Sequence, residues 1–116
     1  MEYKEIQCLC DNAGGDSDEN EYSIGPFKLM GADGDILYLF NGLSHKDDGP
    51  SYTSFHDNGN IFMLEYKIHG KYHNENGPAY SEYNEDGSII TELYCLNGKL
   101  LSLNDYQKQI ATKLYW

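Results

Sequence analysis

The chain of 116 residues contains no arginine. Its eight lysines are outnumbered by nineteen aspartates and glutamates, so the formal net charge is −11. Proteins that bind DNA or RNA directly need basic stripes, and arginine is favoured for contacts with phosphates and bases. Residues 1–60 carry a net charge of −9 and residues 61–116 only −2. The composition therefore predicts no direct nucleic-acid binding, and its uneven negative field favours encounter with a basic partner.

Long apolar runs are missing as well. No stretch approaches the roughly 18 consecutive apolar residues of a membrane-spanning helix. Residues 1–5 lack the basic start and the apolar block of a secretion signal. The chain has three cysteines, Cys8, Cys10 and Cys95. An odd number suits reduced thiols packed as small core side chains, so we expect a cytoplasmic protein with no membrane contact.

Catalytic and metal-binding motifs are also missing. There is no Gly-x-Ser-x-Gly, no phosphate-binding glycine loop and no recognised cysteine–histidine signature. The Cys8-Leu9-Cys10 spacing does not suit structural zinc. An acidic stretch from Asp16 starts like a calcium loop, but Glu21 replaces its required glycine and Phe27 its final glutamate. We therefore predict a protein that is not an enzyme and binds no cofactor or metal.

The sequence does contain an internal repeat of 28 residues. The matching positions are Tyr38, Tyr66 and Tyr94; Asn41-Gly42, His69-Gly70 and Asn97-Gly98; His45 and His73; Gly49-Pro50 and Gly77-Pro78; Tyr52 and Tyr80; and Gly59 and Gly87. A period of this length is typical of one supersecondary unit stacked on its own copies, none of which buries its apolar face alone.

Each copy has the pattern of a β-hairpin. Short apolar strands flank a turn with glycine, which supplies the positive φ that such turns need. The expected strands are 27–30 and 36–40 around Asp33-Gly34-Asp35, 51–56 and 61–68 around Gly59, and 79–84 and 89–96 around Gly87. Residues 2–10 are expected to form a further strand, and residues 11–21 an acidic loop.

The pattern changes after Leu101, where no third histidine or Gly-Pro follows. Ser102 or Asn104 can cap a helix, and an apolar stripe follows at helical spacing. The stripe consists of Leu103, Tyr106, Ile110 and Leu114. We therefore predict one mainly β domain, an antiparallel meander of stacked hairpin repeats. It would comprise an N-terminal strand and acidic loop (1–24), the repeats (25–101) and a C-terminal capping helix (102–116).

The pattern Asn-Gly-x-x-His-x-x-x-Gly-Pro, with a tyrosine two residues later, resembles the MORN-like repeats of phage, bacterial and large-virus proteins. The resemblance covers about residues 25–105. It implies an elongated β-meander that acts as a scaffold for protein or lipid contact, and some bacterial relatives are described as antitoxins. The first copy lacks the histidine, and the last lacks both the histidine and Gly-Pro.

His45 and His73 occupy equivalent positions in successive copies. A metal pair or an acid–base role is one interpretation. The alternative is that each imidazole bonds the backbone of its own Gly-Pro loop, which explains both residues at once. We favour the structural interpretation.

Partner binding is assigned to two alternative sets of residues. The acidic set is Asp16, Asp18, Glu19, Glu21, Asp33, Asp35, Asp47 and Asp48. The aromatic set, expected to be exposed on one sheet face, is Tyr52, Tyr72, Tyr80 and Tyr83. Tyrosine is enriched at protein interfaces, and an antiparallel sheet often leaves one face open.

The leading hypothesis is an inhibitor of phage or mobile-element type, such as an anti-CRISPR-like protein. Its carboxylates would mimic nucleic-acid phosphates and block a basic, nucleic-acid-binding site on a larger protein. A second hypothesis is an antitoxin or immunity protein that masks a toxin with the tyrosine face. A third is a structural MORN-like module, in which open sheet edges allow a homodimer.

Overall fold

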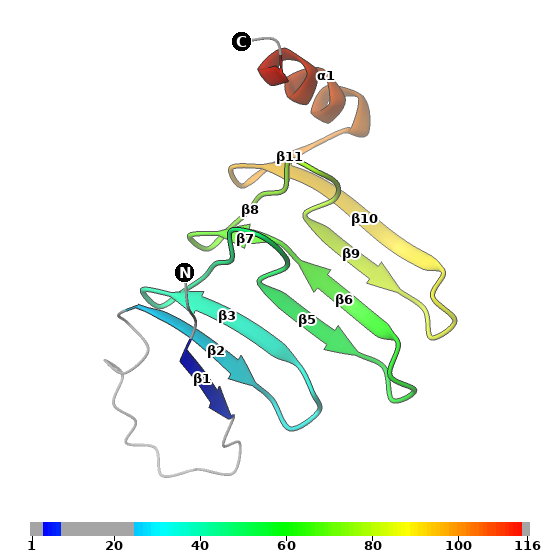
Figure 1. The fold of residues 1–116 in the computed structure, drawn as a ribbon. Helices are drawn as coiled ribbons and strands as arrows, with labels where there is room; N and C mark the ends of the chain where they lie inside the picture. The colour runs from blue at the N-terminus through cyan, green and yellow to red at the C-terminus, as the bar shows by residue number, and fades with distance from the viewer. Residues whose placement is uncertain (1–3, 8–24, 115–116) are drawn as a thin grey trace.

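The computed structural model describes residues 4–7 and 25–114. The strands are β1 (Lys4–Gln7), β2 (Pro26–Met30), β3 (Ile36–Phe40), β4 (Leu43–Ser44), β5 (Tyr52–Phe55), β6 (Ile61–Glu65), β7 (Lys67–Ile68), β8 (Lys71–Tyr72), β9 (Tyr80–Tyr83), β10 (Ile89–Leu96) and β11 (Lys99–Leu101). One helix, α1 (Leu103–Leu114), follows them. The main sheet has the order β1-β2-β3-β5-β6-β9-β10-β11, and β4 pairs with β3 (Figure 1).

Three hairpins, β2–β3, β5–β6 and β9–β10, lie side by side in the order of the chain (Figure 1). Each turns at a glycine with positive φ: 89° at Gly34, 90° at Gly59 and 91° at Gly87. A residue with a side chain would be strained at such angles, which is why glycine occupies this position in all three turns. The predicted fold class, an antiparallel meander of hairpins with a C-terminal helix, is confirmed.

The molecule is thin and elongated. Its radius of gyration is 16.0 Å, against about 13 Å for a compact chain of this length. Its principal extents are 50 × 35 × 21 Å. The largest fully buried side chains are those of Ser51 and Ser81, so among the described residues no bulky side chain is completely enclosed. Contacts between neighbouring hairpins, rather than one central core, hold the sheet together.

The second hairpin corrects a prediction. Residues 61–68 do not form one strand, because β6 ends at Glu65 and β7 pairs with β8 in a separate two-stranded ribbon. Tyr66 lies at the break. Its N–H donates to the carbonyl of Ala79 (2.7 Å), and its carbonyl accepts from the N–H of His73 (3.0 Å). The equivalent Tyr38 makes the same two bonds, to the carbonyl of Ser51 (2.7 Å) and from the N–H of His45 (3.0 Å), within the continuous strand β3, so this pair of bonds is a feature of the repeat and not the cause of the break.

The first strand also departs from a pure antiparallel meander. Its described part, β1, pairs in parallel with β2 through the register Lys4↔Phe27 to Gln7↔Met30. Parallel neighbours need a connection of a dozen or more residues. The segment between Gln7 and Pro26 is long enough for that connection, whereas the short turns elsewhere permit only antiparallel pairs.

Helix α1 follows the last hairpin and covers only its upper end (Figure 1). Its start is capped as predicted, since the N–H of Asp105 donates to Oγ of Ser102 (3.1 Å). Within the stripe, Tyr106 is buried (5% exposed) and Ile110 is half-buried, but Leu103 is 47% exposed, so its assignment to the buried face of the helix is wrong. No helix in the described part of the chain is long and apolar enough to cross a membrane.

Candidate functional site

The two ends of the strands form two different edges of the sheet. We call the row of hairpin turns 31–35, 56–60 and 84–88 the turn edge. The segments 41–50, 67–78 and 97–102 at the opposite ends of the strands form the corner edge. The two edges lie on opposite sides of the sheet (Figure 1).

The turn edge repeats one backbone geometry three times. In the middle turn, the N–H of His56 donates to the carbonyl of Asn60 (2.8 Å), and the N–H of Gly59 donates to the carbonyl of His56 (2.9 Å). The same two bonds close the turns 31–35 and 84–88, at 2.8 to 3.1 Å. Successive turns are two strands apart, which corresponds to about 10 Å.

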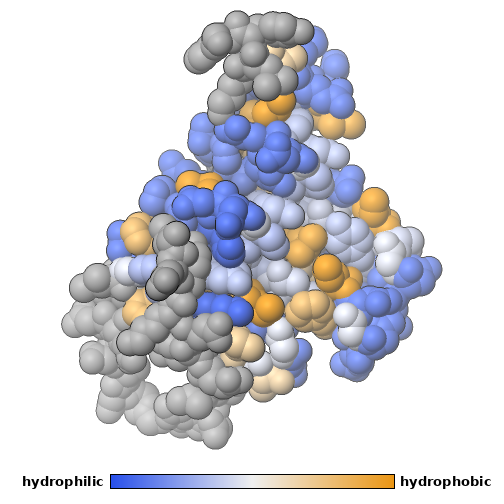
Figure 2. Space-filling view, in the orientation of Figure 1, coloured by the Kyte–Doolittle hydropathy of each residue, from blue (hydrophilic) through white to orange (hydrophobic). Residues whose placement is uncertain are grey.

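Carboxylates project from all three turns, and none of the three contains a lysine. Asp33, Asp57, Glu85 and Asp86 are exposed. Hydrogen bonds from Ser88 hold the pKa of Asp86 below its usual value. Figure 2 shows hydrophilic side chains where the β5–β6 and β9–β10 turns lie. The turn edge is therefore a row of negative charge on a regular scaffold.

Side chains also tie neighbouring turns to each other. The Nδ2 atoms of Asn58 and Asn60 both donate to the carbonyl of Glu85, at 3.0 and 2.8 Å. Nε2 of His56 lies 2.8 Å from the carbonyl of Tyr83, to which it donates. These bonds fix the spacing of the second and third turns, so a partner need not order them on binding.

The acidic set predicted from the sequence does not form one surface. Asp33 and Asp35 lie on the turn edge, but Asp47 and Asp48 lie on the corner edge, so treating them as one surface is wrong. The backbone reverses direction at every turn and corner, which separates residues that are close in sequence. Asp35 is half-buried and accepts a hydrogen bond from the hydroxyl of Tyr52 (2.9 Å). The remaining four residues, Asp16, Asp18, Glu19 and Glu21, lie outside the described part of the chain.

Asp47 and Asp48 have cationic or imidazole partners on the corner edge. Oδ1 of Asp47 is 2.9 Å from Nε2 of His45. Asp48 pairs with Lys46, whose hydrogen bond and charge lower the pKa of that carboxyl. Sequence reasoning missed the residues that replace them on the turn edge, namely Asp57, Glu85 and Asp86. Their position beside Gly59 and Gly87 in the repeat was the available signal.

The predicted tyrosines are half-buried rather than exposed. Their register explains why: Tyr52 and Tyr80 pair with Glu65 from either side, so all three lie on one face of the sheet. Tyr72 donates to Oε2 of Glu65 (3.1 Å), and its ring meets that of Tyr80 edge-on with centroids 6.1 Å apart. Burial, followed by the charge of Glu65, raises the pKa of Tyr72 to about 12.

The hydroxyl of Tyr80 is engaged in the same way. It donates to Oε1 of Glu82 (3.2 Å), whereas Tyr83 accepts from His56 through its backbone carbonyl. Glu65 lies at the centre of the group, where it accepts from Tyr72, and Nζ of Lys67 lies 3.6 Å from its Oε1. Tyrosine–carboxylate pairs thus stabilise the sheet face, and this part of the aromatic set acts as packing.

His45 and His73 join successive repeats. Nδ1 of His45 accepts from the backbone N–H of His69 (2.9 Å), and Nδ1 of His73 accepts from that of Asn97 (2.9 Å). The two donors sit at the positive-φ corners, at 50° and 52°. Because Nδ1 accepts, the proton is on Nε2, which donates to Asp47 in one copy and to Glu75 (3.3 Å) in the other. Each histidine has a structural role, but the prediction that it bonds the backbone of its own loop is wrong: it bonds a carboxylate of that loop, and its backbone partner lies in the next corner.

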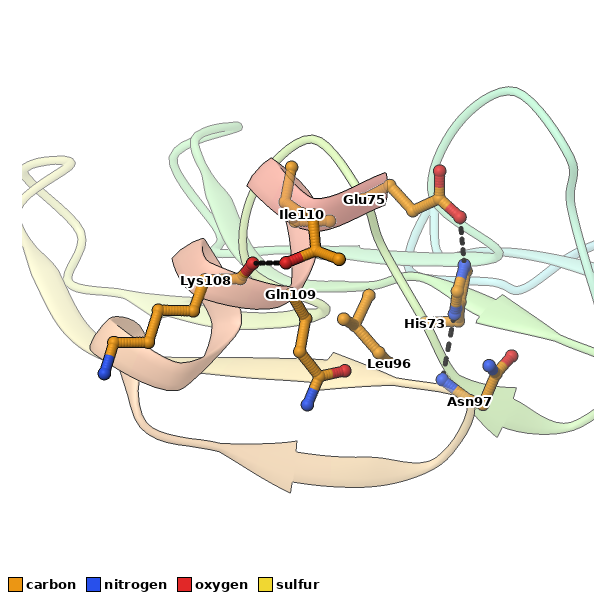
Figure 3. A pocket seen from close by; sticks show the side chains of 8 residues that line it. His73, Glu75, Leu96, Asn97, Lys108, Gln109 and Ile110 are labelled. Carbon is orange, nitrogen blue, oxygen red and sulfur yellow. Dashed lines mark hydrogen bonds and ion pairs between the residues drawn. The ribbon is translucent and has the colours of Figure 1, made fainter. Parts of the chain in front are cut away.

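A pocket lies on the corner edge between His73 and the helix, and a second pocket adjoins it at His73 (Figure 3). The first, of about 540 Å³, is lined by His73 and Glu75, by Leu96 and by Ile110 of α1. The second, of about 600 Å³, shares His73 and Glu75 and extends to Lys46. Both ring nitrogens of His73 are already bonded, so the imidazole here acts as a structural group. Among the described residues, no three His, Cys, Asp or Glu side chains are grouped so as to hold a metal ion.

No protein-family model, curated protein or solved structure matches this chain. The MORN-like resemblance therefore stays a prediction. No ligand or catalytic residue is transferred from a relative, and the function has to be inferred from where the chain places its charges.

Proposed function

We propose that the chain is a non-enzymatic binding protein whose turn edge contacts a basic surface of a larger protein. Where that surface normally binds nucleic acid, the chain would act as its inhibitor. The observation that carries the proposal is the segregation of charge along the strands. All three turns present carboxylates without a lysine, whereas on the corner edge the carboxylates Asp47, Asp48 and Glu75 lie among Lys46, Lys67, Lys71 and Lys99.

Geometry supports this assignment over a diffuse effect of net charge. The exposed carboxylates stand at roughly 10 Å intervals on turns of identical backbone geometry. Asn58 and Asn60 cross-link two of those turns. A rigid row of like charges speeds encounter with a complementary partner and loses little conformational freedom on binding.

The tyrosine face supports the antitoxin alternative less well. Three of its four hydroxyls bond to carboxylates of the same sheet, and all four side chains are half-buried. These contacts stabilise the scaffold whether or not a partner is present. We therefore assign the first contact with the partner to the turn edge.

The experiment compares two variants of equal charge change. Asp33→Lys with Asp57→Lys alters the turn edge, and Asp48→Lys with Asp105→Lys alters exposed carboxylates elsewhere. The probe is an arginine-rich peptide, measured by fluorescence anisotropy against a salt series and with single-stranded DNA as competitor. We expect the turn-edge variant to lose at least tenfold in affinity and the control variant much less, with DNA competing for the peptide.

Circular dichroism would first establish that both variants are folded. Equal losses in the two variants would mean that only net charge matters, and binding that is insensitive to salt would remove the carboxylates from the mechanism. Loss on Tyr80→Phe, with the turn-edge variant unaffected, would favour the tyrosine face instead.

A further inference from the structure

We propose that the open edge of β10 pairs with the same edge of a second copy, giving a two-fold symmetric dimer with one continuous antiparallel sheet. The pairing segment is Ile89–Leu93. The inference concerns assembly and does not depend on the function proposed above.

In the two preceding hairpins, the strand equivalent to β10 pairs on its outer side with the next strand of the sheet. The outer side of β3 is covered by β5, and the outer side of β6 is covered by β9. By contrast, β11 covers β10 only at Tyr94, Cys95 and Leu96. Helix α1 follows in place of the next loop and strand, and it lies at the upper end (Figure 1). Within the described residues, no strand pairs with the outer side of Ile89–Leu93.

Repeat equivalence also shows which backbone groups point outward. Leu64 pairs across the ladder with Ser81 of the next hairpin, and Glu92 is the residue 28 positions after Leu64. On the inner side, the carbonyl of Leu93 accepts from the N–H of Ala79 (2.8 Å). Because backbone groups alternate along a strand, the N–H and carbonyl of Glu92 point away from β9. An unpaired row of this kind is a template for another strand.

The side chains of this segment are unusually apolar for an exposed position. Ile89 is 56% exposed, Ile90 is 50% and Leu93 is 38%. A strand laid beside β10 would cover part of all three. The chain therefore presents both unpaired backbone groups and apolar surface on one short segment.

A second copy fits this edge because the segment is self-complementary. Where β10 pairs with β9, the register shifts between Ile89 and Thr91, so regular backbone alternation holds from Thr91 to Leu93 and each end of the paired segment includes this irregularity. Antiparallel pairing centred on Thr91 places Ile89 opposite the partner's Leu93, and Ile90 opposite the partner's Glu92. The aliphatic pair of Ile89 with the partner's Leu93 would stabilise the two neighbouring strands. The pairing is limited to five residues, because β11 already pairs with β10 from Tyr94 onward.

Charge complementarity selects the antiparallel arrangement. In each copy the turn edge carries carboxylates without a lysine, whereas the corner edge carries Lys67, Lys71 and Lys99 together with Asp47, Asp48 and Glu75. Antiparallel pairing brings the turn with Glu85 and Asp86 of one copy toward the corner with the partner's Lys99. A parallel arrangement would bring like charges together, which disfavours association.

Net charge sets the salt dependence. Two copies each carry −11, and their Glu92 side chains lie two positions apart across the dyad. Screening this repulsion should strengthen the dimer as salt rises. Binding to a basic partner weakens with salt, so failure of one proposal is distinguishable from failure of the other.

The experiment is sedimentation equilibrium of the full chain at several concentrations and at low and high salt. The test variant is Ile89→Lys, which places a charge on the open edge. The matched control is Ile61→Lys, the residue 28 positions before Ile89. It is 38% exposed and lies on β6, whose outer side already pairs with β9 at Met63, Leu64 and Glu65. We expect a concentration-dependent dimer that Ile89→Lys weakens at least tenfold, that Ile61→Lys leaves intact and that Glu92→Gln strengthens.

Hydrogen exchange of the unmodified chain provides an independent measurement. The amide of Glu92 should become protected as the dimer forms, while the exposed amide of Asp57 should not change. A chain that stays monomeric at all concentrations and salts would overturn the proposal. A dimer weakened equally by both lysine variants would also overturn it, because the copies would then be stacked by their faces.

Discussion

The turn edge and the corner edge are built by the same strands and use polar residues in opposite ways. On the turn edge, short turns closed by backbone bonds leave the carboxylates exposed to solvent. On the corner edge, longer loops direct His45 and His73 inward, where each imidazole bonds the next repeat. Lysines there lie over aromatic rings, as Lys67 does over Tyr72 at 4.5 Å. Both edges join neighbouring copies, but on the turn edge amide and imidazole groups make those bonds, which leaves the carboxylates exposed.

The largest difference between the tyrosine–carboxylate face and the turn edge should appear in unfolding at alkaline pH. Burial raises the pKa of Tyr72 to about 12, and burial also raises the pKa values of Tyr52, Tyr80, Tyr94 and Tyr106. An unfolded tyrosine ionises near pH 10. The neutral tyrosines therefore make their full contribution to the free energy of unfolding below about pH 10. That contribution is lost as pH rises through the folded-state pKa, because the unfolded chain then binds fewer protons than the folded chain.

Circular dichroism and tyrosinate absorbance, followed together during an alkaline titration, would measure this loss. Tyr72→Phe removes one of the ionising groups and should move the unfolding midpoint to higher pH. The turn-edge substitution Asp57→Asn should leave the midpoint unchanged. If Tyr72→Phe left it unchanged too, the tyrosine–carboxylate face would not limit alkaline stability.

The next effect should be loss of a histidine bond. His45→Ala removes the acceptor for the N–H of His69 and the donor to Asp47. Leaving a buried donor unsatisfied costs about 1–3 kcal/mol. His73→Ala should cost less, because its side chain is 19% exposed, against 4% for His45, and water can replace the bond.

Urea unfolding would measure both variants. Asp57→Ala provides a surface control and should change the free energy of unfolding by less than about 0.5 kcal/mol. Comparable losses for Asp57→Ala and His45→Ala would contradict the division between a structural edge and a presenting edge.

The smallest effect should come from the backbone of the turns. Gly59→Ala forces a side chain into φ 90°, although nothing lies within 4 Å of the added Cβ. Backbone strain alone should therefore destabilise the fold by about 1 kcal/mol. Gly49→Ala on the corner edge also meets nothing within 4 Å and has no such φ, so it should be neutral or slightly stabilising. Thermal unfolding of the pair would reveal whether φ, rather than space, explains the glycine.

Much of the fold was predictable because it is encoded locally. Asp33-Gly34 and its equivalents specify turns, and the turn residues place the hairpins. Ser102 specifies the helix start. The break at Tyr66 was not predictable, since Tyr38 at the equivalent position makes the same pair of backbone bonds within the continuous strand β3.

The candidate site was only partly predictable. Asp33 was correctly placed on a turn. Its separation from Asp47 was not predictable, because it depends on turns and corners lying at opposite ends of the strands. Glu65 accepts a hydrogen bond from Tyr72 and pairs with residues of two neighbouring strands, but nothing in the linear sequence marks it for this role. Its role appears only once the register brings Tyr52 and Tyr80 to either side of it.

The sequence by itself determined the repeating unit: a 28-residue period, a glycine at each positive-φ turn, and an end to the array after Leu101. These features follow from backbone sterics and hydrogen bonding over a few residues, so they can be read directly. Only the tertiary structure decided which carboxylates share an edge, which repeat each histidine bonds and which strand is left uncovered. Those outcomes depend on how one hairpin lies against the next, since the relevant partners come together across the sheet rather than along the chain.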